Sequence, residues 1–499
     1  MNDADMLVSD ILARGRAQHP NKSAIVGEHL SRTYGELADR VEQIAGALAA
    51  AGMRPRDRMA ILTANHPGVV EVCLAAAMIG AVVVPLNPRA TADDIAFQAD
   101  DADAGYAFVQ SELEPLARAG GLLDRPSWCS GEDLEKLVAM GKPYRGSRPS
   151  SDDVLVQLYT SGTTGRPKGC LLTHRGWLSS ISGWAHATGM SSRDVVWAQL
   201  PLFHVAGLHF LFTTLATAGT FVVDGPGDAA RFWDVVQARS VTVATLFPNP
   251  SGIVDHPEAS RSSGSIRLAF SEQTSDALAR SLPGVTIGTS YGATELGGMA
   301  LAAFGDECVR PGAVLGRPLL GMTVAVLDDN DVPVPRGEVG ELCFRGASTT
   351  PGYWKLPDPS AAVLRNGWLH TGDLGREDPD GLIFFVDRKK DMVKPGGENV
   401  YSVEVEAALL AHPAVTECAV IGVPDERWGE AVKAVVVARE KVTAEELDLW
   451  CLDRLAAFKR PRWYDFIPAL PRNATAKVVK PELRAAHDPA TSTRLPERT

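Results

Sequence analysis

Cysteine is scarce in this sequence and occurs in no paired arrangement. The seven cysteines lie far apart, and no two of them form a C-x-x-C pair, which argues against a disulfide framework and against a thiolate zinc site. Long apolar runs are also missing: the longest, from Val72 to Val84, is far shorter than the ~20 residues that a membrane-spanning helix needs. Residues 1–5 carry acid where a secretory signal carries base. We therefore expect no signal peptide and a reducing, cytoplasmic location.

Concentrated positive charge is absent too. Lysine and arginine number 49 against 61 aspartates and glutamates, a net charge of −12 with no basic block, so neither duplex nucleic acid nor an anionic membrane is an expected partner. The chain itself is ordinary: 45% of its residues are hydrophobic and 22% are charged, as in globular proteins. Its 499 residues are too many for one core and indicate a multidomain protein.

Helical and strand patterns alternate along most of the chain. Thr33 and Glu36 fit a capping box, after which apolar residues recur at helical spacing. The alternation of helix and strand is predicted at 34–48 and 58–62, at 71–80 and 81–85, and at 232–239 and 241–247. This rhythm is typical of layered α/β sheets.

The pattern changes twice toward the C-terminus. Short strands broken by turns between residues 324 and 386 indicate a β-rich subdomain, and a compact α+β unit follows from residue 400. The boundary is expected near Lys389, and the tail is expected to fray from about His487. The predicted fold class is therefore α/β, with an N-terminal domain over residues 1–388, made of two α/β lobes and a β-rich lobe, and a small mobile domain over residues 389–499.

The strongest local motif is the segment from Tyr159 to Gly169. It holds three glycines, four hydroxyls and two cations, and the apolar segment 154–158 would deliver a strand into it. Glycines let backbone N–H groups approach phosphate oxygens, hydroxyls donate to them, and Arg166 and Lys168 supply positive charge. The spacing is not that of a Walker A loop. We interpret the segment as a polyphosphate-binding loop.

This loop resembles that of the adenylate-forming acyl-CoA synthetases, and further segments resemble the same family in the same order, above all its benzoate-type and 4-coumarate-type CoA ligases. The matching segments are Pro201-Leu202-Phe203-His204, Tyr291-Gly292-Ala293-Thr294-Glu295, Trp368-Leu369-His370-Thr371-Gly372-Asp373, Asp387-Arg388-Lys389-Lys390-Asp391, Gly396-Gly397-Glu398-Asn399 and Pro471-Arg472-Asn473-Ala474-Thr475-Ala476-Lys477. The resemblance implies an enzyme that makes acyl-CoA thioesters from a carboxylic acid, ATP and coenzyme A through an acyl-adenylate, with Mg²⁺.

The resemblance also implies a role for each residue in the first half-reaction. Glu295 would hold Mg²⁺, Lys477 would bridge the carboxylate and the α-phosphate, and His204 would belong to an aromatic gate. The residues implied to hold ATP are Thr160, Ser161, Gly162, Thr163, Thr164, Gly165 and Lys168 at the phosphates, Ser271, Glu272, Gln273, Tyr291, Gly292, Ala293 and Thr294 at the adenine and phosphates, and Asp373 and Arg388 at the ribose.

For the second half-reaction the family rotates its C-terminal domain, and Lys390 occupies the hinge position. Trp428 and Phe458 resemble aromatic contacts to coenzyme A, and Arg460 a phosphate contact. Ordinary domain packing is an equal reading for Trp428. No carrier-protein motif follows the lysine loop, so free coenzyme A is the expected acceptor.

Two positions depart from the family pattern. The chain reads Ser271-Glu272-Gln273-Thr274-Ser275 where the family has a turn of small residues against the purine, and Ala476 where many members have glycine. These departures leave open a narrower activity: a protein that transfers the acyl group from a supplied acyl-adenylate, made by a partner enzyme, to coenzyme A. A nucleotide sensor without turnover is an alternative of another class, disfavoured because Glu295, Asp373 and Lys477 are all present.

The acyl substrate is predicted from the residues that the resemblance places in its pocket, namely Trp184, His204, Val205, Phe247, Ser290, Gly297 and Gly298. Tryptophan and phenylalanine offer flat apolar walls, and the two glycines are expected to leave room, which favours a bulky cyclic or aromatic acid. A medium-chain fatty acid is the main rival. The motifs also leave open luciferase-type oxidation, and a monomer or a homodimer.

Overall fold

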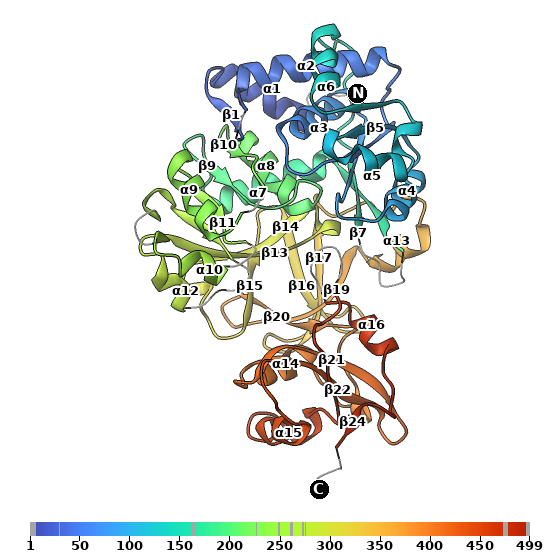
Figure 1. Ribbon diagram of the computed structural model, residues 1–499, viewed down its shortest axis with the longest axis vertical. Coiled ribbons are helices and arrows are strands. Elements are labelled where there is room, and N and C mark those ends of the chain that lie inside the picture. Colours follow the sequence, from blue (N-terminus) through green and yellow to red (C-terminus); the bar gives the residue numbers. More distant parts are fainter. Residues whose placement is uncertain are drawn as a thin grey trace. The chain divides into compact units, whose positions relative to one another are not determined.

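The computed structural model describes residues 6–28, 30–160, 166–225, 227–247, 250–259, 263–271, 274, 276–472 and 478–495 (Figure 1). It divides into a larger unit, Met1–Val324 with Cys343–His370, and a smaller unit, Ala325–Leu342 with Thr371–Thr499. The domain boundary after residue 388 stays a prediction.

The first sheet of the larger unit has six strands in the order β6-β5-β3-β4-β7-β8, all parallel to their neighbours except β8, which runs antiparallel to β7. The strands are β3 (Arg58–Leu62), β4 (Val82–Leu86), β5 (Ala104–Val109), β6 (Ser127–Cys129), β7 (Val154–Thr160) and β8 (Lys168–Thr173), and the intervening helices are α3 (Pro67–Ile79), α4 (Ala92–Asp101), α5 (Glu114–Ala119) and α6 (Glu132–Met140).

The predicted capping box is confirmed at the start of α2 (Tyr34–Ala50). The Glu36 N–H donates to the Thr33 hydroxyl at 3.1 Å, and the Thr33 N–H donates to the Glu36 carboxylate at 2.8 Å. The strand predicted at 58–62 is β3. Both were predictable because the cap and the apolar periodicity act within a few residues.

The second sheet of the larger unit runs β15-β14-β13-β12-β11-β9-β10-β1-β2. Its middle strands are parallel, and β2, β14 and β15 pair antiparallel to their neighbours. The strands are β1 (Ser23–Val26), β2 (Ser31–Thr33), β9 (Val195–Trp197), β10 (Thr220–Val222), β11 (Val243–Thr245), β12 (Leu268–Phe270), β13 (Thr286–Ala293), β14 (Gly298–Phe304) and β15 (Ala313–Pro318), and the helices are α1 (Val8–Gln18), α7 (His174–Thr188), α8 (Val205–Ala216), α9 (Ala229–Arg239), α10 (Pro250–Val254) and α12 (Asp276–Ser281). The predicted alternation at 232–247 is confirmed by α9 and β11.

Short strands fill the region predicted to be β-rich. They are β16 (Met322–Leu327), β17 (Gly340–Gly346), β18 (Leu364–Arg365), β19 (Trp368–Glu377) and β20 (Ile383–Arg388), with α13 (Pro357–Val363) before β18. Strands β19 and β20 pair antiparallel, with Asp373 directly opposite Arg388.

The C-terminal part of the smaller unit is a four-stranded sheet with helices, as predicted. The strands are β21 (Val415–Asp425), β22 (Gly429–Ala438), β23 (Trp463–Phe466) and β24 (Thr493–Arg494), and the helices are α14 (Ser402–Leu410), α15 (Ala444–Leu452) and α16 (Lys480–Ala485). The expectation that the chain frays from His487 is wrong as far as Leu495: β24 pairs with β23, and Leu495 is buried in the core. Tertiary contacts order a segment whose composition alone is that of a loose tail.

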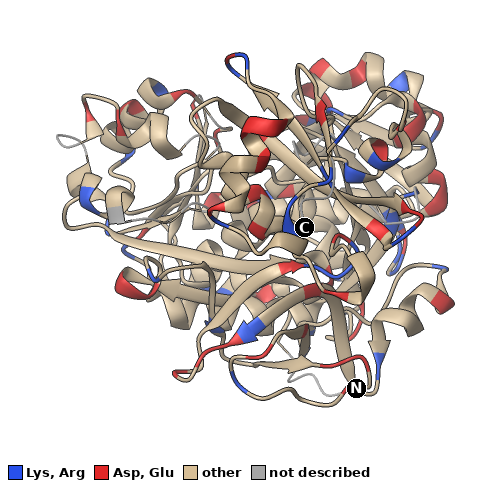
Figure 2. Ribbon diagram, turned by 90° about the horizontal axis from the view of Figure 1, so that it is seen from below, with Lys and Arg blue, Asp and Glu red and all other residues tan. Residues whose placement is uncertain are grey.

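Acidic and basic residues are interspersed along the chain, as Figure 2 shows. Among the described helices, none is long and apolar enough to cross a membrane.

Candidate functional site

The two ends of the predicted phosphate loop lie on paired strands of the larger unit. Thr160 ends β7, Lys168 begins β8, and the two residues face each other across the antiparallel pair. The strand predicted to lead into the loop is therefore confirmed. The pairing of Thr160 with Lys168 holds the two strand ends side by side. Five residues between them lie outside the described residues: Ser161, Gly162, Thr163, Thr164 and Gly165.

Glu295 is held by a residue far along the chain. It lies in the short 3-10 helix Thr294–Leu296, and its carboxylate accepts a hydrogen bond of 2.9 Å from the Tyr353 hydroxyl. The Lys168 ammonium lies 5.3 Å from the centre of the Tyr353 ring. Burial, and next the charge of Glu295, raise the pKa of Tyr353 well above its ordinary value, so the phenol keeps its proton and remains a donor. The structure thus brings a carboxylate and a cation to the same tyrosine side chain.

These residues fit a magnesium-phosphate site. A carboxylate is a preferred ligand of Mg²⁺, and the hydrogen bond from Tyr353 orients Glu295 while leaving acceptor capacity on its carboxylate. The thiol of Cys170, on β8, is fully buried, and burial together with the Glu295 charge raises its pKa well above the ordinary value. Cys170 therefore stays a neutral thiol and adds no charge to the site.

Tyr353 is a residue that our sequence analysis missed. Its backbone pairs with Cys170, while the Thr350 N–H donates to the Glu295 carbonyl at 2.8 Å. The local signal was a turn, Pro351-Gly352, followed by two aromatic residues. That signal marks a loop but not its partner, which is 58 residues earlier in the chain.

The predicted adenine segment runs along β13. Tyr291 stacks on Phe344 with ring centres 5.8 Å apart and planes inclined by 18°, and the strand is irregular between Tyr291 and Gly292. A Cβ atom at Gly292 would lie 2.2 Å from the Gly298 carbonyl oxygen, so glycine is required for the close approach of the two strands. Ala293 and Thr294 follow at the end of β13 and the start of the 3-10 helix.

The turn that departs from the family pattern is only partly described. Ser271 is buried after β12, and its N–H donates to the Gly288 carbonyl at 3.0 Å. Glu272, Gln273 and Ser275 lie outside the described residues. The effect of this departure on adenine binding stays a prediction.

The predicted ribose residues lie together in the smaller unit. The Arg388 guanidinium is 3.3 Å from the Asp373 carboxylate across the β19–β20 pair. The Asp373 N–H donates to the Thr371 hydroxyl at 3.1 Å, within β19. A carboxylate next to a guanidinium can accept two hydroxyls while the guanidinium donates to a third oxygen.

The predicted acyl-pocket residues belong to, or adjoin, the aromatic core of the larger unit. Trp184 on α7 is 0% exposed, with its ring centre 4.8 Å from that of Phe270 and 5.7 Å from that of Phe210. Val205, the first residue of α8, is also buried, while His204 caps that helix by accepting from the Ala206 N–H at 3.4 Å. Phe247 and Ser290 are half-buried.

The expectation that Gly297 and Gly298 leave room for substrate is wrong. Both have positive φ, +70° and +117°, and a Cβ atom would lie 2.6 Å from the Ser348 carbonyl oxygen and 2.4 Å from the His209 ring, respectively. Protein atoms fill the space beside them. These glycines are required by the backbone turn and by close packing.

His209 is the second residue that the sequence analysis missed. It is fully buried on α8, and its Nε2 lies 2.9 Å from the Ser180 hydroxyl. Burial lowers the pKa of His209 to about 3, so the ring is neutral at neutral pH. Its ring centre is 5.8 Å from that of Trp184. A histidine in the apolar run of α8 was the available signal.

The three predicted coenzyme A residues differ in exposure. Trp428 is 39% exposed and Phe458 is 42% exposed, so both offer an aromatic surface. Arg460 is a correction: it is 2% exposed and its guanidinium pairs with Asp448 at 2.5 Å. A buried, neutralised arginine presents no free charge to a phosphate.

The predicted hinge follows β20 directly. Lys390 is exposed, whereas Lys389 binds Asp329 at 2.8 Å and Asp391 binds Arg484 at 2.8 Å. The predicted catalytic Lys477 lies outside the described residues. Arg472 and Val478 pair on either side of residues 473–477, so the two ends of the lysine loop lie side by side.

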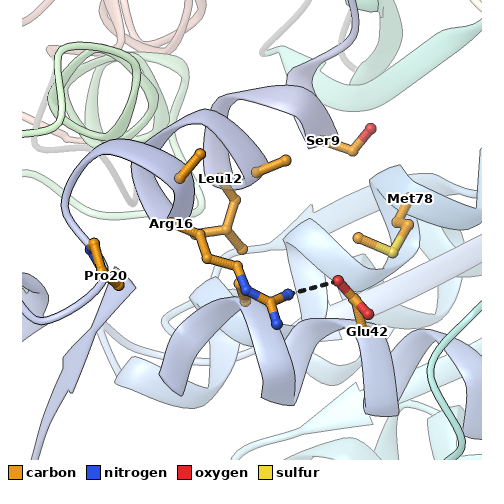
Figure 3. Close-up of a pocket in the computed structure, with 9 residues that line it drawn as sticks. Ser9, Leu12, Arg16, Pro20, Glu42 and Met78 are labelled. Carbon is orange, nitrogen blue, oxygen red and sulfur yellow. Dashed lines mark hydrogen bonds and ion pairs between the residues drawn. The ribbon is translucent and has the colours of Figure 1, made fainter. Parts of the chain in front are cut away.

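A cavity of about 450 Å³ lies elsewhere in the larger unit, between α1, α2 and α3 (Figure 3). Its wall is mostly apolar, with Leu12 and Met78, and an ion pair of 2.8 Å joins Arg16 to Glu42 (Figure 3). Among the described residues that line it, none is a predicted site residue.

Comparison with known proteins gives a family match over most of the chain. The family model "AMP-binding enzyme" matches residues 12–354, and "AMP-binding enzyme C-terminal domain" matches residues 404–477. The chain is 35% identical over 477 residues to a feruloyl-CoA synthase of Amycolatopsis sp, covering 93% of this chain and 96% of that protein. It is 33% identical over 499 residues to the fatty acid--[acyl-carrier-protein] ligase ScoC of Streptomyces coeruleorubidus, covering 94% of each.

Its fold is similar to that of a solved o-succinylbenzoate coenzyme A synthetase from Bacillus subtilis in complex with ATP and magnesium ion. The TM-score is 0.85 at 28% identity, covering 95% of this chain and 98% of that one. These matches agree with the β7–β8 hairpin, Glu295 and the Asp373–Arg388 pair described above, and together they establish the family. The chain belongs to the AMP-binding enzymes and, within them, to the adenylate-forming acyl-CoA ligases.

Proposed function

We propose that this protein joins a bulky cyclic or aromatic carboxylic acid to coenzyme A in two steps. The acid attacks the α-phosphorus of ATP, which forms the acyl-adenylate and releases pyrophosphate. The thiol of coenzyme A then attacks the acyl carbon, which forms the thioester and releases AMP. The observation that supports this most directly is the Glu295 carboxylate held by Tyr353, with Lys168 against the same ring.

In the first step, charge must be neutralised and the reactants held in line. Lys168 and the loop 160–169 hold the phosphates, and Glu295 holds Mg²⁺, which neutralises phosphate charge when bound. Asp373 accepts the ribose hydroxyls, with Arg388 beside it. Lys477 brings a mobile positive charge to the α-phosphate and the attacking carboxylate.

In the second step the exposed aromatic residues of the smaller unit receive coenzyme A. Trp428 and Phe458 are available for this because each keeps a large exposed surface. Rotation of the C-terminal domain about Lys390 would move the lysine loop away from the acyl-adenylate and bring the coenzyme A residues to it. Since one relative acts on an acyl carrier protein, the acceptor is part of the test below.

The aromatic core of the larger unit supports the proposed substrate class. Trp184 packs against Phe210 and Phe270, and we propose that these rings supply flat apolar walls for the acyl group. The neutral His209 with Ser180 adds one buried polar pair. Such a wall suits a ring with a polar substituent better than a plain alkyl chain. The names of the feruloyl and o-succinylbenzoate relatives agree with this class, while the fatty-acid relative keeps the medium-chain acid as the rival.

We further propose a cytoplasmic enzyme that acts as a monomer or a homodimer. Seven free cysteines support a reducing compartment. The narrower activity, with a separate enzyme supplying the adenylate, depends on residues 272–275, of which the structure describes only Thr274.

The deciding experiment separates the half-reactions on the purified protein. One arm follows pyrophosphate exchange with ATP, Mg²⁺ and a panel of aromatic, cyclic and fatty acids. The other arm supplies preformed acyl-adenylates with either coenzyme A or an acyl carrier protein. We expect aromatic acids to give pyrophosphate exchange and the coenzyme A thioester. Thioester formation without pyrophosphate exchange would show that the protein has only the narrower activity. No activity in either arm would refute the proposal.

A further inference from the structure

The C-terminal segment His487–Leu495 is fastened to the smaller unit by its backbone. Strand β24 pairs antiparallel with β23, with Arg494 opposite Trp463. The Leu495 N–H donates to the Arg462 carbonyl at 3.0 Å, and the Leu495 side chain is buried in the core. The segment is therefore part of the folded unit.

A buried lysine ties the same segment to the sheet. Lys433 on β22 has a fully buried side chain, and its ammonium lies 2.5 Å from the Asp465 carboxylate, 2.9 Å from His487 Nδ1 and 2.9 Å from the Ser492 hydroxyl. Burial, and next the Lys433 charge, lower the pKa of His487, so the neutral ring accepts this bond. Two of the three partners that a buried ammonium needs come from the C-terminal segment.

The end of the segment reaches the turn that carries Trp428. The Arg494 guanidinium donates to Asp425 Oδ2 at 3.1 Å, and the Asp425 side chain is only 4% exposed. The other oxygen, Oδ1, accepts from the N–H groups of Arg427 and Trp428, both at 3.0 Å. Asp425 is thus the link between the segment and the turn.

The turn that carries Trp428 also holds the loop that follows the predicted hinge at Lys390. The Gly396 N–H donates to the Trp428 carbonyl at 2.9 Å. The Trp428 ring packs directly on Gly396, whose φ is +61° and where a Cβ atom would lie 2.7 Å from the ring. A continuous set of contacts therefore runs from Arg494 through Asp425 and Trp428 to the loop that begins at Gly396.

We propose that Arg494 is a positioning residue for the thioester-forming step: through Asp425 it fixes the Trp428 turn, and with it the Gly396 loop, in the geometry that receives coenzyme A. This inference rests on the proposed function, in which Trp428 contacts coenzyme A. It assigns the C-terminal segment a role in the second half-reaction only.

The test compares Arg494→Ala, Arg494→Lys and Arg494→Glu with the wild type in the full chain. Arg439→Ala is the matched control, because it removes an exposed arginine from the same unit. Three readouts are taken: pyrophosphate exchange, the KM and kcat for coenzyme A with supplied acyl-adenylate, and hydrogen exchange of the amides of residues 425–430 and 394–400.

We expect Arg494→Ala to raise the KM for coenzyme A about three- to tenfold, because a charge pair with one nearly buried partner is lost. Arg494→Glu should raise it further, since it sets two carboxylates against each other. In Arg494→Lys the KM should stay within about twofold of the wild-type value, because the positive charge is kept. Hydrogen exchange of the Arg427, Trp428 and Gly396 amides should become faster in the order Arg494→Lys, Arg494→Ala, Arg494→Glu. Pyrophosphate exchange should stay unchanged in all three variants, and the control Arg439→Ala should match the wild type in every readout.

Two results would overturn the inference. Unchanged amide exchange in Arg494→Glu would show that the segment does not position the turn, and faster exchange with an unchanged KM would show that the turn does not serve coenzyme A. Failure of the proposed function can be distinguished from failure of this inference. In that case the wild type would form no thioester, while hydrogen exchange would still show whether Arg494 positions the turn.

Discussion

Two tryptophans in different units, Trp184 and Trp428, have opposite surroundings. Trp184 is 0% exposed and packs against other aromatic rings. Trp428 is 39% exposed, and its backbone is held by hydrogen bonds to one carboxylate and from Gly396. From the sequence, Trp184 is predicted to be a flat apolar wall for the acyl group, while Trp428 has two equal interpretations, a contact to coenzyme A or ordinary domain packing.

The difference shows how each unit keeps its site in place. In the larger unit Trp184, a predicted acyl-pocket residue, is fixed by burial, so changing it changes the stability of the core. In the smaller unit the aromatic surface is fixed by a few polar contacts around a turn, so it can be altered with little effect on folding. Each prediction below breaks or sharpens this contrast.

The largest effect should come from truncating the buried tryptophan. Trp184→Ala should lower the free energy of unfolding by about 3–5 kcal/mol, as large-to-small changes of buried aromatic residues do, whereas Trp428→Ala should lower it by less than about 1 kcal/mol. Urea denaturation followed by hydrogen exchange in each unit measures both. Equal losses would mean that exposure does not separate the two residues.

A smaller but still large effect is expected at Glu295, the carboxylate that we propose to bind Mg²⁺. Glu295→Gln should slow pyrophosphate exchange about 10²- to 10³-fold, because one charged group at the reacting phosphates is removed, and should slow thioester formation from supplied adenylate much less. Glu132→Gln is the control, since this glutamate is exposed on α6. A comparable slowing of both half-reactions would count against Glu295 as the magnesium residue.

Particular buried groups in the two units should contribute to acid stability with opposite signs. The pKa of His209 in the larger unit is lowered to about 3 from 6.5 by burial, so below pH 6.5 the unfolded chain binds a proton that the folded chain excludes, and stability falls as the pH falls. In the smaller unit, burial raises the pKa values of Asp387 and Glu406. There the folded chain binds protons more tightly, so these groups stabilise it at low pH and lose that contribution as the pH rises through their raised pKa values.

The measurement is urea denaturation of the wild type and His209→Gln at pH 7.5 and pH 5. The wild-type larger unit should lose about 2 kcal/mol of stability from this histidine at pH 5, and His209→Gln should lack that part of the pH dependence. An unchanged pH dependence in the variant would contradict the assignment of a buried neutral ring.

The smallest expected effect compares two exposed phenylalanines of the smaller unit. Phe458 and Phe466 are each 42% exposed, but only Phe458 is predicted to contact coenzyme A. Phe458→Ala should raise the KM for coenzyme A by about three- to tenfold, the loss of one aromatic contact, and Phe466→Ala should leave it unchanged. The same KM in both variants would remove Phe458 from the site.

By itself, the sequence determined the local features of this protein. The Thr33–Glu36 capping box, strand β3 and strand β7, which leads into the predicted phosphate loop, follow from caps, periodicity and apolar runs that act within a few residues. The order of the motifs identified the family, because each motif is contiguous in the chain. Those features could be predicted without knowing what packs against them.

Only the tertiary structure decided which distant residues meet. Tyr353 reaches Glu295 across 58 residues and Arg494 reaches Asp425 across 69, so no local pattern announces either pair. The same holds for the burial of Arg460 against Asp448 and for the space beside Gly298 that His209 fills. The physical reason is that exposure and charge pairing depend on the neighbours that packing supplies, and sequence periodicity predicts a buried face without saying which residues cover it.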